Sequence, residues 1–242
     1  MDEVDDRTPV LGLSPLAILE GVPTSLILAD PDTARDALTF ASRAARASGD
    51  GVRLQAADGI LVMTAAALAP HGLFDATPTI LALRVGRSDP ELRCDIVVDD
   101  LSPTADPCAL ALPETGRSPA WAGVSPPRSG WAHRGHLGAD TIARRAQWGI
   151  SAVAHGSPPG AGEEAVRAFR ARVWGEPDED LLGLPRGVAF AAHAYGFVSG
   201  AEQVPITVSG RWTRLAFGRG HVLSRGPAAV GLTPVRATGT RD

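Results

Sequence analysis

The sequence predicts an α+β protein, with an N-terminal helix plus an antiparallel sheet and a C-terminal helical unit closed by a β-meander. Strand-like runs dominate the chain before residue 113, and helical periodicity dominates the part that follows. Asp58-Gly59 between two apolar runs is typical of a tight β-hairpin. With 242 residues, of which 44% are apolar, the chain can bury a sizeable core.

The first part of the chain is predicted to hold an unstructured lead and two helices. Residues 1–12 are acidic and lack apolar periodicity, so we expect them to be disordered. Ser14 and Pro15 are typical of the start of a short helix that ends at Glu20. Asp30 and Pro31 repeat this pattern before residues 31–47, where apolar residues share one helical face.

An antiparallel sheet of about four strands is expected next. Asp58-Gly59 favours a type I′ turn between the first two strands. A polar turn at residues 87–90 separates the next two, which by hairpin logic would also be neighbours. The expected strands are 52–57, 60–66, 79–85 and 92–98, with 110–112 as a candidate edge strand.

The chain then divides into two subdomains, which we place at residues 13–115 and 116–242. Residues 113–131 are rich in proline and glycine, as expected of a boundary. Beyond them, helical periodicity starts near Asp140 and again after Glu163 and Glu164. Further expected elements are a buried apolar segment at 187–198 and a terminal β-meander at 204–208, 211–217 and 221–225.

The composition excludes several classes of function. The chain is lysine-free, and its positive charge rests on 23 arginines. A P-loop, a pyridoxal Schiff base and a protein kinase site each need a lysine. Arginine instead suits the recognition of carboxylates and phosphates. A net charge of -4 provides no basic field, so we expect no nucleic acid partner.

The sequence also favours a cytoplasmic protein. Four carboxylates among the first six residues are unlike a secretory signal, and no apolar run reaches the roughly 20 residues of a membrane span. Cys94 and Cys108 are too few for a disulfide framework or a cysteine zinc site. We expect them to pack in the core, with a short disulfide-closed loop as the alternative.

Motifs for metal, cofactor or acid/base chemistry are incomplete. His133, His136 and Asp140 could converge on one ion, but glycines interrupt a helix there and further ligands are not evident, so we expect histidines in a connector and no metal site. The Gly-x-Gly-x-x-Ala string at residues 160–165 lacks a preceding strand, so we expect no nucleotide cofactor. Asp95 and Asp99 would lie roughly 13 Å apart along a strand, too far to share a proton.

Nucleophilic serine chemistry is not indicated either. The chain has no Gly-x-Ser-x-Gly elbow. His193 lies in an apolar helical segment and is expected to be a hydrogen-bonded core histidine. No catalytic residue is therefore predicted.

The best candidate binding site combines tryptophan and arginine. These two residue types are the most enriched where binding energy concentrates in interfaces, because one offers rigid apolar area and the other bidentate hydrogen bonds and stacking. The alternative is that the tryptophans seal the junction between subdomains and the arginines line a solvated strand. The candidate residues are Trp121, Arg128, Trp131, Arg211, Trp212 and Arg214.

These observations lead to a noncatalytic cytoplasmic accessory or protein-interaction protein as the first hypothesis, without cofactor or metal. The alternative is an enzyme or small-molecule binder whose arginines hold an anionic, phosphate- or carboxylate-bearing ligand.

Overall fold

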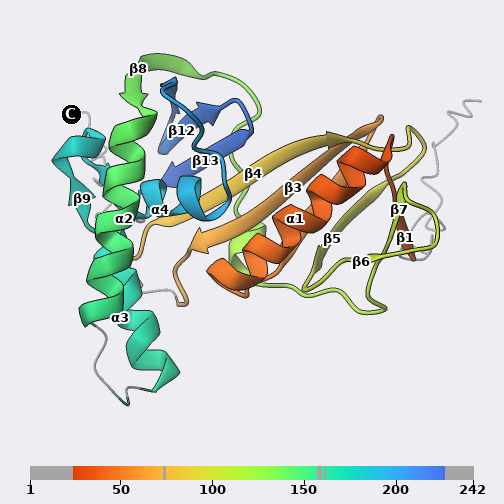
Figure 1. The fold of residues 1–242 in the computed structure, drawn as a ribbon, viewed down its shortest axis with the longest axis horizontal. Coiled ribbons are helices and arrows are strands. Elements are labelled where there is room, and N and C mark those ends of the chain that lie inside the picture. The colour runs from red at the N-terminus through yellow and green to blue at the C-terminus, as the bar shows by residue number, and fades with distance from the viewer. Residues whose placement is uncertain (1–23, 73–74, 157–159, 161, 227–242) are drawn as a thin grey trace, which may run out of the picture.

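The computed structural model describes residues 24–72, 75–156, 160 and 162–226. The predicted acidic lead and the helix at 15–20 lie outside the described residues. The described part combines helices with antiparallel sheet, which confirms the α+β class (Figure 1).

An eight-stranded antiparallel sheet runs through both halves of the chain, in the order β5-β2-β3-β4-β13-β12-β11-β8. The ladder between β4 and β13 joins the halves and pairs residues 79–83 with 221–225. The prediction of two subdomains that divide near residue 116 is not tested by this continuity. The strands are β2 (Val52–Ala57), β3 (Ile60–Leu68), β4 (Thr79–Arg87), β5 (Cys94–Val98), β8 (Ala132–Gly138), β11 (Gln203–Ser209), β12 (Trp212–Phe217) and β13 (Gly220–Arg225).

Two small sheets accompany the large one. One consists of β1 (Ser25–Ile27), β7 (Ala109–Ala111) and β6 (Ser102–Pro103), and the other of β9 (Pro177–Asp178) and β10 (Leu184–Pro185). The candidate edge strand at 110–112 therefore exists as β7, but it pairs with β1 outside the large sheet.

Helices cover one face of the large sheet. The helix α1 (Pro31–Ala47) packs on β3 and β4, and α4 (Gly187–Ala194) packs where β4 meets β13 (Figure 1). Next to α4 lie α2 (Ala139–Gly156) and α3 (Glu163–Gly175). One continuous hydrophobic core fills the space between these helices and the sheet.

Local signals explain α1 and the hairpin that follows. Asp30 caps α1 because its carboxylate accepts the backbone N–H of Thr33 at 2.7 Å, and Pro31 occupies the first turn. Asp58 and Gly59 both have positive φ, 52° and 76°, as a type I′ turn requires. Both predicted elements are confirmed.

The predicted pairing of the next two strands is wrong. β4 and β5 exist, but β5 pairs with β2 at the far edge of the sheet while β4 lies between β3 and β13. Residues 88–93 thus cross the hairpin formed by β2 and β3. As a result, β5 forms its ladder with β2 and not with β4.

In the second half, the meander and the helices are confirmed, and two expectations are wrong. His133 and His136, expected in an irregular linking segment, lie on the edge strand β8, which pairs with β11 around a bulge near Gly135. His193 lies exposed on α4 and not in the core, because the buried side of this helix is made of Val188, Ala189, Ala191 and Ala192.

Candidate interaction surface

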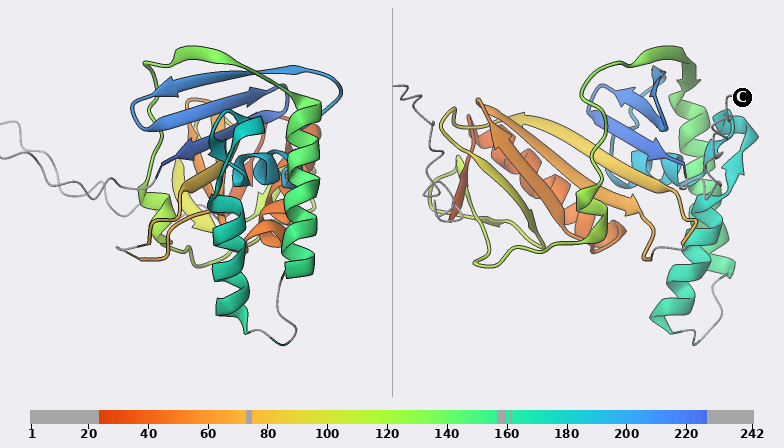
Figure 2. Two further views of the ribbon diagram at one scale, coloured as in Figure 1. Left: turned by 90° about the vertical axis from the view of Figure 1, so that its left-hand side faces the viewer. Right: turned by 180° about the vertical axis from the view of Figure 1, so that it is seen from behind.

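The face of the sheet opposite α1 carries apolar side chains across several strands. On β3 these are Ile60, Val62 and Ala66, because Leu61 and Met63 point into the helix-covered core. Their cross-strand partners on β4 share this face, so Val85 lies beside Val62, and Leu81 lies beside Ala66. No α-helix of the described chain packs on this second apolar face, here called the helix-free face (Figure 2).

Part of this face is covered by residues 113–131, here called the connector. A short 3-10 helix, η1 (Ala120–Gly123), brings Trp121 against the strands. Trp121 is 5% exposed and donates its indole N–H to the carbonyl oxygen of Asp50 at 3.2 Å. The cluster below the connector contains Ala66, Ala69, Leu81, Val97, Trp121, Trp212 and Leu223, with Trp131 packed against it.

An apolar hollow of about 550 Å³ lies where the connector leaves the face open. Ile60 is 47% exposed and lines this hollow with the half-buried Val62 and Leu83, and the neighbouring Val85 is 51% exposed. Trp121 closes one side, and Arg128 stands on the connector at the rim. The hollow therefore has an apolar floor and a polar margin.

A bidentate ion pair fixes the rim of the hollow. Arg53 donates from Nε and Nη2 to the two carboxylate oxygens of Asp95, at 2.7 and 2.8 Å. The same guanidinium donates to the carbonyl oxygen of Ala122 at 2.7 Å and so ties the connector to β2. Hydrogen bonds from Arg53 lower the pKa of Asp95, and burial raises the pKa of the neighbouring Cys94 thiol. The rim is thus charged, and the Arg53–Asp95 pair holds the connector against it.

The six candidate binding residues do not form one site in the structure. Trp121, Trp131 and Trp212 meet in the cluster below the connector, where Trp212 is only 6% exposed. The Arg214 guanidinium lies 4.6 Å from the centre of the Trp131 ring, and its Nε donates to the Thr207 hydroxyl at 3.2 Å. Arg128 lines the hollow, whereas Arg211 lies away from it and donates to the carbonyl oxygen of Gly226 at 2.9 Å. Whether these residues bind a partner stays a prediction.

Sequence reasoning missed the exposed aliphatic residues Ile60 and Val85. A signal was present, since residues 60–66 carry apolar side chains at almost every position, which is typical of a strand covered on both faces. The sequence could not show that the connector covers only part of the second face.

The other motifs take structural places. The His133 and His136 rings lie 4.7 Å apart on β8, and no group of three or more His, Cys, Asp or Glu is placed to hold a metal within the described ranges. Asp99 pairs with Arg117 at 2.6 Å, and Asp140 pairs with Arg144 at the same distance. In the Gly-x-Gly-x-x-Ala string, Gly162 precedes α3 as its N-cap residue, while residue 161 lies outside the described part.

Two family models match the chain. Residues 22–123 match a model described as Domain of unknown function (DUF8010), and residues 126–229 match one described as Domain of unknown function (DUF8185). No curated protein matches. None of the described helices is long and apolar enough to cross a membrane.

Among solved structures, the chain is similar to several bacterial sliding clamps. A DNA polymerase sliding clamp from Caulobacter crescentus is 13% identical with a TM-score of 0.44, over 90% of this chain and 69% of that one. A putative DNA polymerase III beta subunit from Eubacterium rectale is 12% identical with a TM-score of 0.48, over 87% and 67% of the two chains. A DnaN sliding clamp from Bartonella birtlesii bound to griselimycin is 12% identical with a TM-score of 0.46, over 87% and 66%. The expectation that this chain binds no nucleic acid receives no support from these similarities and stays a prediction.

Proposed function

We propose that this chain is a noncatalytic, cytoplasmic protein-interaction protein that binds its partner through the open part of the helix-free sheet face. The observation that carries the proposal is the apolar hollow beside the connector, which the exposed Ile60 lines and the exposed Val85 adjoins. An exposed apolar patch within a polar rim is typical of a protein-binding surface.

The geometry of this face fits a protein partner. Ile60 and Val85 lie diagonally on neighbouring strands, because Val62 pairs with Val85 and Ile60 with Arg87. An apolar side chain of the partner that enters the hollow would be buried against Ile60, Val62 and Leu83. Removing this apolar surface from water is favourable by about 25 cal/mol per Å² in free energy. Arg128 and the Arg53–Asp95 pair would orient the partner at the rim, where charges contribute mainly to specificity.

The cytoplasmic location belongs to the same proposal. Cys94 and Cys108 are free thiols, which suits a reducing compartment. Fractionation of cells of the source organism tests this part.

The interaction is tested by capturing partners from a lysate of the source organism with wild-type and Val85→Asp protein. The new carboxylate would have to be buried in the complex, so we expect capture to fall by about tenfold or more. Ile150→Asp is the matched control, because Ile150 is 39% exposed on α2, away from this face. Melting temperatures of both variants show that the fold is retained.

A partner that Val85→Asp captures as well as the wild type does would contradict the proposed surface. Loss of capture with Ile150→Asp alone would move the interaction to the helices. Arg128→Ala adds an independent measure, with a smaller loss expected because a rim arginine is largely solvated in the free protein.

A further inference from the structure

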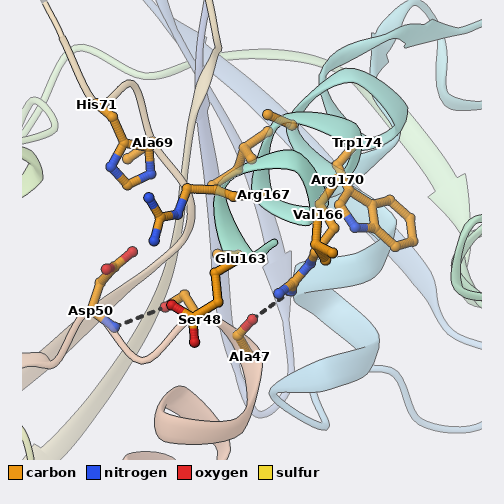
Figure 3. A pocket seen from close by; sticks show the side chains of 13 residues that line it. Ala47, Ser48, Asp50, Ala69, His71, Glu163, Val166, Arg167, Arg170 and Trp174 are labelled. Atoms are coloured by element: carbon orange, nitrogen blue, oxygen red, sulfur yellow. Dashed lines mark hydrogen bonds between the residues drawn. The ribbon is translucent and has the colours of Figure 1, made fainter. Parts of the chain in front are cut away.

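A second pocket, of about 460 Å³, lies between α3, the end of β3 and the turn that follows α1 (Figure 3). Its size is in the range of pockets that hold small molecules. Small apolar residues, among them Ala47, Ala69 and Ala171, form much of its wall. It is separate from the hollow on the helix-free face, and the two share no lining residue.

The pocket is bordered by a buried indole whose N–H is unsatisfied. Trp174 is 2% exposed, and its Nε1 has no hydrogen-bond partner within the described chain. The six-membered ring packs on Gly149 of α2 and the indole stacks on Phe190 at 4.6 Å, so the ring is held in place. In Figure 3 its nitrogen lies on the side of the ring nearest to Arg170. An unpaired buried donor of this kind is destabilising, and a ligand acceptor would satisfy it.

Two arginines add charged donors on the same helix. Arg170 donates from Nη2 to the carbonyl oxygen of Ala47 at 2.7 Å, which fixes its guanidinium at the end of α1. One helical turn earlier, Arg167 pairs with Glu164 at 2.8 Å, and in Figure 3 its guanidinium lies between His71 and Asp50. Trp174, Arg170 and Arg167 therefore form a donor wall along α3.

Acceptors stand close to this donor wall. Asp50 and Glu163 line the pocket, and in the part of the chain that the structure describes neither carboxylate makes an ion pair. The position of Asp50 is fixed through its backbone, because its carbonyl oxygen accepts the Trp121 N–H and its own N–H reaches the Ser48 hydroxyl at 3.4 Å. With two arginines and two carboxylates, the lining has no net charge.

We propose that this pocket binds a small zwitterion, a molecule that carries a carboxylate and an ammonium group. The carboxylate accepts from Trp174 and Arg170, and the ammonium group donates to Asp50 and Glu163. A dianionic phosphate ester fits less well, because both carboxylates would repel it. This inference does not depend on the proposed protein interaction.

The experiment measures binding of standard free amino acids to the whole chain by isothermal titration and by the shift in melting temperature. A ligand that binds only the folded state raises that temperature. Each amino acid is compared with its carboxylate-only and its amine-only analogue. We expect binding by at least one amino acid and a loss of about tenfold or more in affinity for both analogues.

Three variants connect the binding to the pocket. Trp174→Phe keeps an aromatic ring and removes the N–H, and Asp50→Asn removes one acceptor charge; each should weaken binding by about tenfold. Arg167→Gln, at the exposed mouth, should weaken it less and keeps the test valid if Trp174→Phe fails to fold. Arg144→Gln is the matched control, since Arg144 is an exposed helical arginine paired with a carboxylate on α2.

The proposal is overturned if no amino acid binds, if a single-charge analogue binds as tightly as its amino acid, or if Arg167→Gln and Asp50→Asn both bind as the wild type does. Loss of binding in Arg144→Gln would also overturn it. None of these results bears on partner capture through Val85.

Discussion

His221, on β13, has an imidazole that is half-buried near the turn between β12 and β13, and its Nδ1 has no hydrogen-bond partner among the described residues. Burial lowers its pKa below the ordinary value of 6.5, and the charge of Arg214 lowers it further. As the pH falls, the unfolded chain therefore takes up a proton at this histidine before the folded state does.

The consequence is a loss of stability in mild acid. Well above pH 6.5 the histidine is neutral in both states, so it does not affect the free energy of unfolding. As the pH falls below 6.5, the unfolded chain gains a proton that the folded state does not. The free energy of unfolding therefore decreases until the pH reaches the lowered pKa of the folded state. We expect His221→Gln to flatten this part of the stability curve, measured by urea unfolding between about pH 7 and 5. His193→Gln, at an exposed histidine on α4, is the control, and an equal flattening there would contradict the assignment.

At the scale of elements, the contact between α2 and α3 depends on Gly149. Alanine in a helix interior normally stabilises by about 1 kcal/mol relative to glycine. A Cβ at Gly149 would however lie 2.5 Å from Cη2 of the buried Trp174 ring. We predict that Gly149→Ala lowers the free energy of unfolding by roughly 1–3 kcal/mol, measured by denaturant titration.

Gly156→Ala on the same helix provides the comparison. Its Cβ would meet the end of the half-buried Phe169 side chain, which can move aside, so we expect a smaller loss. A more stable Gly149→Ala protein would show that helix propensity outweighs this contact.

Elements set by local signals were predicted from the sequence, and those set by distant pairing were not. The cap at Asp30 and the turn at Asp58-Gly59 act over a few residues, so α1 and the hairpin were found. β8 was missed because two glycines and two histidines hide the alternation of an edge strand whose ladder is supplied by β11. β5 was assigned the wrong neighbour because a polar turn does not reveal which strand edge the chain returns to.

The candidate site shows the same division. From their residue type, Trp121, Trp131 and Trp212 were predicted to belong to one candidate binding site. The structure places the three side chains in one cluster. Their burial depends on the path of the connector over a sheet face, which no periodicity encodes. The same path decides that Ile60 and Val85 stay exposed.

For the whole molecule, the ladder between β4 and β13 makes one sheet of both halves. The core on its helix-covered side is likewise continuous, from Leu54 on β2 to Leu215 on β12. We expect a single cooperative unfolding transition, with the calorimetric enthalpy close to the van't Hoff enthalpy. Two resolved transitions would mean that the halves, matched by separate family models, are also separate folding units.

The same ladder sets a delay during synthesis. β4 is complete at Arg87, but its second neighbour begins at Gly220, about 130 residues later, or roughly 6 to 26 s at ordinary rates of translation. During this interval the nascent chain presents Ile80, Leu81 and Leu83 along an unpaired strand edge, a template for pairing with other chains. A ribosome that stalls anywhere between these strands therefore holds a chain prone to aggregation, and that exposure ends only when β13 pairs with β4.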